Sequence, residues 1–191
     1  MVVTLIIVTG VTGMYRMFHE SQNLTLTTKN RIEAIQIARE GMEAMKNIRD
    51  TNWLIFSSDV ENCWNTLNYN PSCIGDTGVT RDIQDTAHYT ITLDTNNRWI
   101  LSEPSGVTNY IYSDSDYRDA FAVKKDANNL YTQSGGTDFK PIYTREIQVS
   151  YTGSSTDSNS EKMDVSVTVR WSDTSTHEIS FESRLTNWKK D

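Results

Sequence analysis

This chain of 191 residues contains little cysteine, proline or glycine: two Cys, three Pro and nine Gly. Two cysteines exclude a disulfide-dense scaffold, and so little proline and glycine excludes collagen-like and Pro/Gly-rich disordered chains. A mean hydropathy of -0.55 excludes a protein that crosses a membrane several times. The length therefore suits one domain of ordinary size with an appendage.

Positive charge is also in short supply, because 18 Lys and Arg stand against 25 Asp and Glu and leave a net charge of -7. Cations adjoin one another only in doublets, such as Lys124-Lys125 and Lys189-Lys190. Nucleic acids are bound chiefly by clustered cations, so we expect no nucleic-acid partner. The sequence also lacks a phosphate-binding glycine loop, a nucleophile elbow and grouped metal ligands, so we expect no cofactor, no metal site, no catalytic residues and no enzymatic activity.

The first 18 residues reverse this polar character, since they hold about a dozen large apolar residues and one charge, Arg16. A helix that spans a bilayer needs about 20 apolar residues, so the run is slightly short by itself. It lacks the basic start and small-residue cleavage site of a signal peptide, which favours an anchor over a removed signal or a buried core helix. The side chains expected to meet lipid or other copies of the helix are Val2, Val3, Leu5, Ile6, Ile7, Val8, Val11, Met14 and Phe18.

Residues 24–53 continue this segment as an amphipathic helix, because apolar and small residues recur there at spacings of three and four. We expect one series to pack on a sheet: Ile35, Ala38, Met42 and Met45. We expect a neighbouring series to face another helix: Ala34, Gly41, Ala44 and Ile48. In the apolar half, residues 1–23, Gly10 and Gly13 leave two alternatives open, a local bend or close contact with neighbouring helices.

Beyond residue 53 the apolar period changes from helical to alternating. Residues 163–171 and 179–185 alternate on either side of a polar turn, which predicts a hairpin, and residues 147–151 add a third strand to form a meander. Shorter strands are expected at residues 89–93, 99–101, 110–112, 121–123 and 130–131. A long helix followed only by strands predicts an α+β fold, with the helix packed on an antiparallel sheet formed by residues 54–191.

Two small groups of residues could carry chemistry. Cys63 and Cys73 are the only thiols, and in an exported chain a disulfide is favoured over free thiols. Asp114, Asp116 and Asp119 could surround a calcium ion, but the Gly and the closing Glu of an EF-hand are missing. An acidic surface loop is therefore the favoured interpretation of these carboxylates.

Taken together, these features resemble the type IV pilin family. The resemblance is carried by residues 38–53 at the helix end, by residues 165–171 and 185–188 in the closing hairpin, and by the strand entry at 139–149. It implies an apolar and then amphipathic N-terminal helix that carries a β-sheet domain. It also implies a structural subunit, whether major pilin, minor pilin or pseudopilin, that is held in the inner membrane and then assembled into a filament at the cell surface. Its implied partners are copies of itself or related pilins and the pilus assembly machinery.

One family hallmark is missing from the sequence as given, namely a short basic leader ending in Gly, an N-methylated first residue and a Glu five residues into the mature chain. Residues 1–8 resemble the stretch just after that Glu, which predicts a natural start several residues upstream. The alternative hypothesis is a membrane-anchored surface module that binds a ligand and forms no filament.

Overall fold

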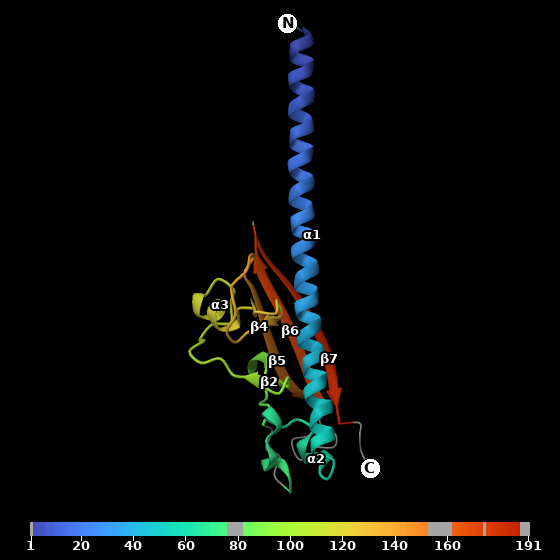
Figure 1. Cartoon of the computed structure of the whole chain (residues 1–191), viewed down its shortest axis with the longest axis vertical. Coiled ribbons are helices and arrows are strands. Elements are labelled where there is room, and N and C mark those ends of the chain that lie inside the picture. Colours follow the sequence, from blue (N-terminus) through green and yellow to red (C-terminus); the bar gives the residue numbers. More distant parts are fainter. Residues whose placement is uncertain (1, 76–81, 153–161, 174, 188–191) are drawn as a thin grey trace. The chain divides into compact units, whose positions relative to one another are not determined.

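The computed structural model describes residues 2–75, 82–152, 162–173 and 175–187. Helix α1 (Val2–Ile55) is followed by a β-rich domain (Figure 1). The chain divides into two compact units, Met1–Glu33 and Ala34–Asp191, and each is described by itself. In the second unit, the end of α1 packs on a five-stranded antiparallel sheet, which confirms the predicted α+β class.

The main sheet has the strand order β2-β1-β5-β6-β7, and every neighbouring pair is antiparallel. Its strands are β1 (His88–Leu93), β2 (Trp99–Ser102), β5 (Tyr143–Thr152), β6 (Lys162–Ser172) and β7 (Thr176–Thr186). The predicted meander is confirmed, since β6 pairs with β5 on one side and with β7 on the other. The loop at 153–160, the residue Trp188 and the doublet Lys189-Lys190 lie outside the described residues.

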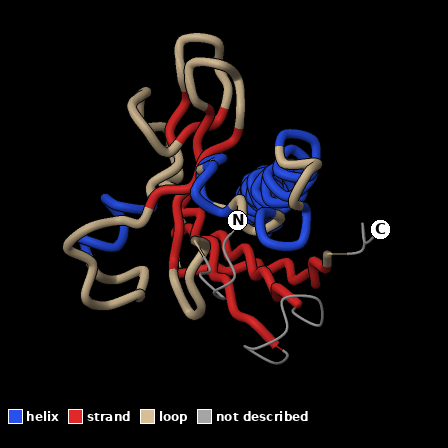
Figure 2. Tube along the Cα trace, turned by 90° about the horizontal axis from the view of Figure 1, so that it is seen from below, coloured by secondary structure: helices blue, strands red, loops and turns tan. Residues whose placement is uncertain are grey.

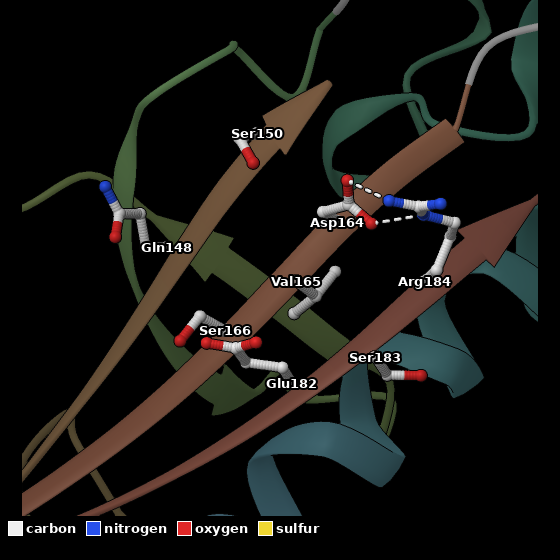
Figure 3. Close-up of a pocket in the computed structure, with 8 residues that line it drawn as sticks. All are labelled: Gln148, Ser150, Asp164, Val165, Ser166, Glu182, Ser183 and Arg184. Atoms are coloured by element: carbon white, nitrogen blue, oxygen red, sulfur yellow. Dashed lines mark hydrogen bonds and ion pairs between the residues drawn. The ribbon is translucent and has the colours of Figure 1, made fainter. Parts of the chain in front are cut away.

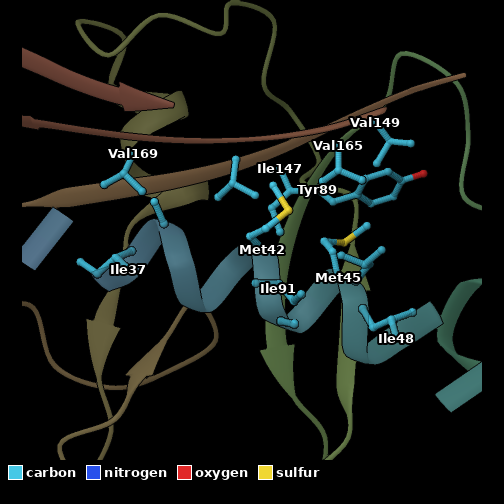
Figure 4. Packing of buried hydrophobic residues seen from close by; sticks show 14 of the residues in the cluster. Ile37, Met42, Met45, Ile48, Tyr89, Ile91, Ile147, Val149, Val165 and Val169 are labelled. Carbon is cyan, nitrogen blue, oxygen red and sulfur yellow. The ribbon is translucent and has the colours of Figure 1, made fainter. Parts of the chain in front are cut away.

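Side chains alternate between the two faces of each strand, and one face of the sheet forms the core with α1. On β6 the inward residues are Met163, Val165, Val167, Val169 and Trp171, all of them buried. Figure 4 shows Met42 and Met45 of α1 lying against Ile147 and Val165. Figure 2 shows α1 on one side of the strands and helix α3 (Ser115–Phe121) on the other.

The structure corrects the prediction of which helix residues face another helix. The four residues assigned to that role are all buried in the core beneath α1: Ala34, Gly41, Ala44 and Ile48. A Cβ atom added to Gly41 would lie 3.0 Å from Val167 Cγ1 and 3.1 Å from Arg145 Cδ. Gly41 therefore lies directly against the sheet, where a larger side chain would meet Val167 and Arg145.

The residues predicted to pack on the sheet occupy different places. Ala38, Met42 and Met45 are buried in the same core cluster, whereas Ile35 is half-buried and lies outside it. Ile37, which is fully buried, lies in the core at this level of the helix.

Between β2 and β5 the chain contains less strand than predicted. Residues 110–112 form no strand, and Phe121 ends helix α3. The predicted strand at 130–131 is represented by β4 (Tyr131–Thr132), which pairs with β3 (Lys124–Lys125) in a separate two-stranded sheet. Helix α3 forms because the Asp114 carboxylate accepts a hydrogen bond from the backbone N–H of Asp116 and caps the first turn. The acidic segment is therefore a helix start.

Three short elements follow α1 and surround the disulfide: α2 (Val60–Cys63), η1 (Leu67–Tyr69) and η2 (Pro71–Cys73). Cys63 and Cys73 are bonded, with an S–S distance of 2.07 Å. Both sulfurs belong to a buried cluster with Phe56 and Tyr69. The disulfide thus fastens the chain segment that leaves α1.

Replacing Cys63 and Cys73 together by Ala is expected to lower the free energy of unfolding by somewhat under about 3 kcal/mol, the chain-entropy value for so short a loop. Urea unfolding followed by tryptophan fluorescence would measure the change. The slope against urea should rise only slightly, because opening so short a loop exposes little additional surface in the unfolded chain. An unchanged midpoint would contradict a stabilising role for the bond.

Candidate assembly helix and the surfaces of the β domain

The first unit of the chain is a helix whose apolar side chains have no cover. Every described side chain from residue 2 to residue 29 is exposed, including Ile6 at 62% and Phe18 at 61%. An 18-residue stretch of α1 has a mean hydropathy of 1.4, so this helix is long and apolar enough to cross a membrane. A signal sequence near an N-terminus meets the same criterion.

The nine side chains predicted to form the contact surface are all exposed, and they do not form a stripe. Residues 2, 3 and 5–8 are apolar in near-continuous order, and successive residues turn by about 100° around a helix. The helix is therefore apolar on all sides over these turns. Such a helix is covered by lipid or by other helices on every side.

The polar groups in this apolar half are satisfied within the helix itself. Thr9 Oγ1 donates to the Leu5 carbonyl at 2.9 Å, and Thr12 Oγ1 donates to the Val8 carbonyl at 2.9 Å. Hydroxyl groups bonded in this way can enter an apolar environment without a lost partner.

Gly10 and Gly13 lie within α1 without interrupting it. Apart from the adjoining residues and the local helix backbone, no atom of the described residues lies within 4 Å of a Cβ added at either glycine. Glycines on an apolar helix let another backbone approach closely. Of the two alternatives predicted for this pair, the helix runs through both glycines without a break, and contact with neighbouring helices stays a prediction.

Arg145 ties the second half of α1 to the sheet. This side chain is fully buried and donates to Glu40 Oε1 at 2.8 Å, to the Ile91 carbonyl at 3.1 Å and to Gln133 Oε1 at 3.1 Å. Burial lowers the pKa of Arg145, and the Glu40 carboxylate opposes that effect. The bonds connect the helix to β1 and β5.

Sequence analysis missed Arg145, although the sequence carries a signal for it. Arg145 takes an inward position of β5 between the buried residues Tyr143 and Ile147. A charge in the apolar series of a strand indicates a buried partner. That partner, Glu40, cannot be identified from the sequence because it is 105 residues away along the chain.

On the opposite face of the sheet, a polar cluster fastens α3. Glu146 accepts hydrogen bonds from Tyr117 at 2.8 Å and from Arg170, and its second oxygen contacts His88 Nδ1. Burial raises the pKa of Tyr117, with a further rise from the Glu146 charge, so the phenol stays protonated and donates. Because each of these groups has a partner, the cluster holds α3 against β5.

A shallow polar concavity of about 610 Å³ lies on the same face (Figure 3). Its lining is Gln148, Ser150, Asp164, Val165, Ser166, Glu182, Ser183 and Arg184. Arg184 donates to both carboxylate oxygens of Asp164, at 2.6 and 3.1 Å, and these bonds lower the pKa of Asp164. Ligand pockets are usually lined mainly by apolar and aromatic side chains, and this surface is not.

Metal ligands do not gather at any of these surfaces. Among the residues that the structure describes, no group of three or more His, Cys, Asp or Glu could hold an ion. Of the carboxylates considered for calcium, Asp114 caps α3, while Asp116 and Asp119 lie on that helix and are exposed.

Asp59 gives the disulfide region a dependence on pH. Its carboxylate accepts from the Gly75 N–H at 2.7 Å and from the Asn62 N–H at 3.4 Å. The bond from Gly75 is the main reason that the pKa of Asp59 lies below its ordinary value of 3.8. A lowered folded-state pKa adds stability above the unfolded-state value, and that stability is lost as the pH falls through the folded-state value.

Asp59→Asn should therefore remove part of the acid sensitivity, since the amide keeps an acceptor oxygen and does not titrate. We expect the native chain to lose more unfolding free energy than the variant when the pH is lowered from 6 to 3. Urea unfolding at both pH values would measure this difference. Equal losses would contradict the assignment.

Comparison with protein families, curated proteins and solved structures finds no match for this chain. The architecture, a long apolar N-terminal helix, an antiparallel sheet and one disulfide, is compatible with a pilin-like fold.

Proposed function

We propose that this chain is a structural subunit of a type IV pilus-like filament that assembles through its N-terminal helix. The observation that carries the proposal is the apolar helix of residues 2–29, whose side chains are all exposed. Burying a large aliphatic or aromatic side chain is worth about 1.5–3 kcal/mol, so a dozen such residues are not left in water. The inner membrane covers them before assembly, and copies of the same helix cover them in the filament.

Two features support packing between helices in addition to contact with lipid. The exposed glycines Gly10 and Gly13 allow close backbone approach. The hydroxyls of Thr9 and Thr12 are already bonded within the helix and require no water in a filament core. The β domain, fastened to the second half of α1 by Arg145, is then carried on the outside.

The test is to recover the native protein from membranes and from material sheared off the cell surface, and to determine its mass and N-terminus. Filaments in the sheared fraction that contain this chain, with a methylated N-terminus upstream of residue 1, would support the proposal. A chain confined to the membrane fraction would overturn it in favour of a tethered surface module.

A further inference from the structure

Strand β7 is a long open edge of the sheet. It has 11 residues and pairs with β6 along its whole length, from Thr176 to Thr186. Within the described part of the chain, β7 has no second neighbour. The strand contains no Pro or Lys, which often keep an edge from pairing. Its charged side chains are Glu178, Glu182 and Arg184, so the edge can pair only with a strand of complementary charge.

The other edge of the same sheet is covered. The Asn68 side chain donates to the Leu101 carbonyl at 2.9 Å and accepts from the Leu101 N–H at 2.9 Å. Tyr69 Oη donates to the Trp99 carbonyl at 2.8 Å. Side chains of η1 thus satisfy backbone groups of β2, as a neighbouring strand would. Among the described residues, the short edge is therefore protected and the long edge has no such cover.

We propose that β7 pairs antiparallel with β7 of a second copy, about a two-fold axis at Phe181, so that the two sheets join. A two-fold interface uses the same surface on both copies. The register centred on Phe181 sets Thr176 opposite Thr186 of the second copy, and it is the register that pairs all 11 residues. It also keeps inward residues opposite inward residues, as a continuous sheet requires.

Charge complementarity supports this register. It places Glu178 directly opposite Arg184 of the second copy, and the two-fold axis makes this contact twice. Within each chain, Glu178 already pairs with Arg170 at 2.6 Å, and Arg184 pairs with Asp164 at 2.6 Å. The joined sheet therefore carries two rows of four charges that alternate in sign, and opposite charges on facing strands stabilise the pair.

Neighbouring registers lack this match. Centring the pair on Ser180 sets Glu178 opposite Glu182 of the second copy, and centring it on Glu182 opposes two Glu182 carboxylates. Like charges directly opposite one another destabilise paired strands. The proposed register also adds an apolar contact on the inner face of the sheet, because the half-buried Phe181 lies opposite Phe181 of the second copy.

The direction of β7 determines which copies can join. Trp53 near the end of α1 donates to Asn187, which directly follows β7, so α1 residues 34–55 and β7 end at the same side of the domain. Antiparallel pairing therefore joins two β domains that point in opposite directions. The contact therefore joins β domains carried on two opposing membranes or on two oppositely directed filaments. It requires only the β domain, so it does not depend on the filament proposal.

Disulfide trapping tests the register with exposed positions. In this pairing Ser180 lies opposite Glu182 of the second copy, with Cα atoms about 4.5–5.5 Å apart, within the range that a disulfide can bridge. Full-length Ser180→Cys and Glu182→Cys chains, each in detergent with about one chain per micelle, would be mixed and oxidised. The native cysteines are already bonded, so the new thiol is the reactive one.

We expect the mixture to form crosslinked dimers at least 10-fold faster than either variant alone. In a dimer of one variant, the two introduced cysteines are two residues out of register and do not lie opposite one another. Arg184→Glu should abolish the crosslink, because it sets two carboxylates opposite one another across the proposed contact. The proposal is overturned if the mixture crosslinks no faster than the single variants, or if Arg184→Glu has no effect while circular dichroism shows an intact fold.

Discussion

Arg145→Ala is expected to lower the free energy of unfolding of the β domain by an amount near the low end of the about 3–5 kcal/mol that removing one partner of a buried ion pair costs, because the Glu40 side chain left behind is 30% exposed. Arg145 is fully buried and donates to Glu40 and to the Ile91 carbonyl. The variant leaves the Glu40 carboxylate and the Ile91 carbonyl without this donor, whereas Gln133 Oε1 still accepts from the Ile91 N–H at 3.1 Å. It also opens a cavity beside Gly41, where an added Cβ atom would lie 3.1 Å from Arg145 Cδ.

The matched control for this experiment is Arg184→Ala. Arg184 also pairs with a carboxylate on the sheet, at 2.6 Å, but its side chain is exposed. Exposed ion pairs contribute little because water and salt screen them, so this variant should unfold close to the native midpoint. Urea unfolding of both variants would measure the contrast. Similar midpoints for the two would show that Arg145 does not hold the helix on the sheet.

Gly41→Leu is expected to destabilise the fold by about 1–3 kcal/mol, the usual range for overpacking a core. Even a Cβ atom at this position meets Val167 Cγ1 at 3.0 Å and Arg145 Cδ at 3.1 Å. Val167 is buried in the sheet, and Arg145 is held by its hydrogen bonds. The gain in helix propensity, about 1 kcal/mol, offsets only part of this effect.

Gly13→Leu is the matched control, because it makes the same substitution in the same helix where no atom lies within 4 Å. It should leave the unfolding midpoint of the β domain unchanged. If the proposed filament forms, the added side chain should reduce the sheared filament fraction severalfold by blocking close helix contact. Thermal unfolding and shear assays on both variants would measure the two effects. The assignment of Gly41 to the core fails if Gly41→Leu folds normally.

The elements that follow a simple period were predictable from the sequence. The alternation at residues 163–171 and 179–185 predicted the β6–β7 hairpin, because a half-buried strand repeats every two residues. The 24–53 helix was predicted for the same kind of reason. Helix α3 was missed because its 7 residues are too few to show a helical period, and its capping Asp114 was interpreted as part of an acidic loop.

The sequence by itself determined the α+β class and the apolar helix, because both depend on local pattern. It favoured a disulfide between its two cysteines, and the structure shows that bond. The tertiary structure decided how the two adjacent stripes of α1 are used. Both stripes were apolar or small, and periodicity cannot rank them. The fold buries residues of both in one core, leaves Ile35 outside it, and sets Gly41 where an added Cβ would contact Val167 and Arg145.

Tertiary structure also decided which groups the buried charges pair with and which edge of the sheet is covered. Arg145 meets Glu40 only after α1 lies on β5, and Asn68 covers β2 only after the η1 segment folds back onto it. These contacts join residues that are far apart in the chain. Their geometry depends on how the elements pack, which local sequence patterns do not specify.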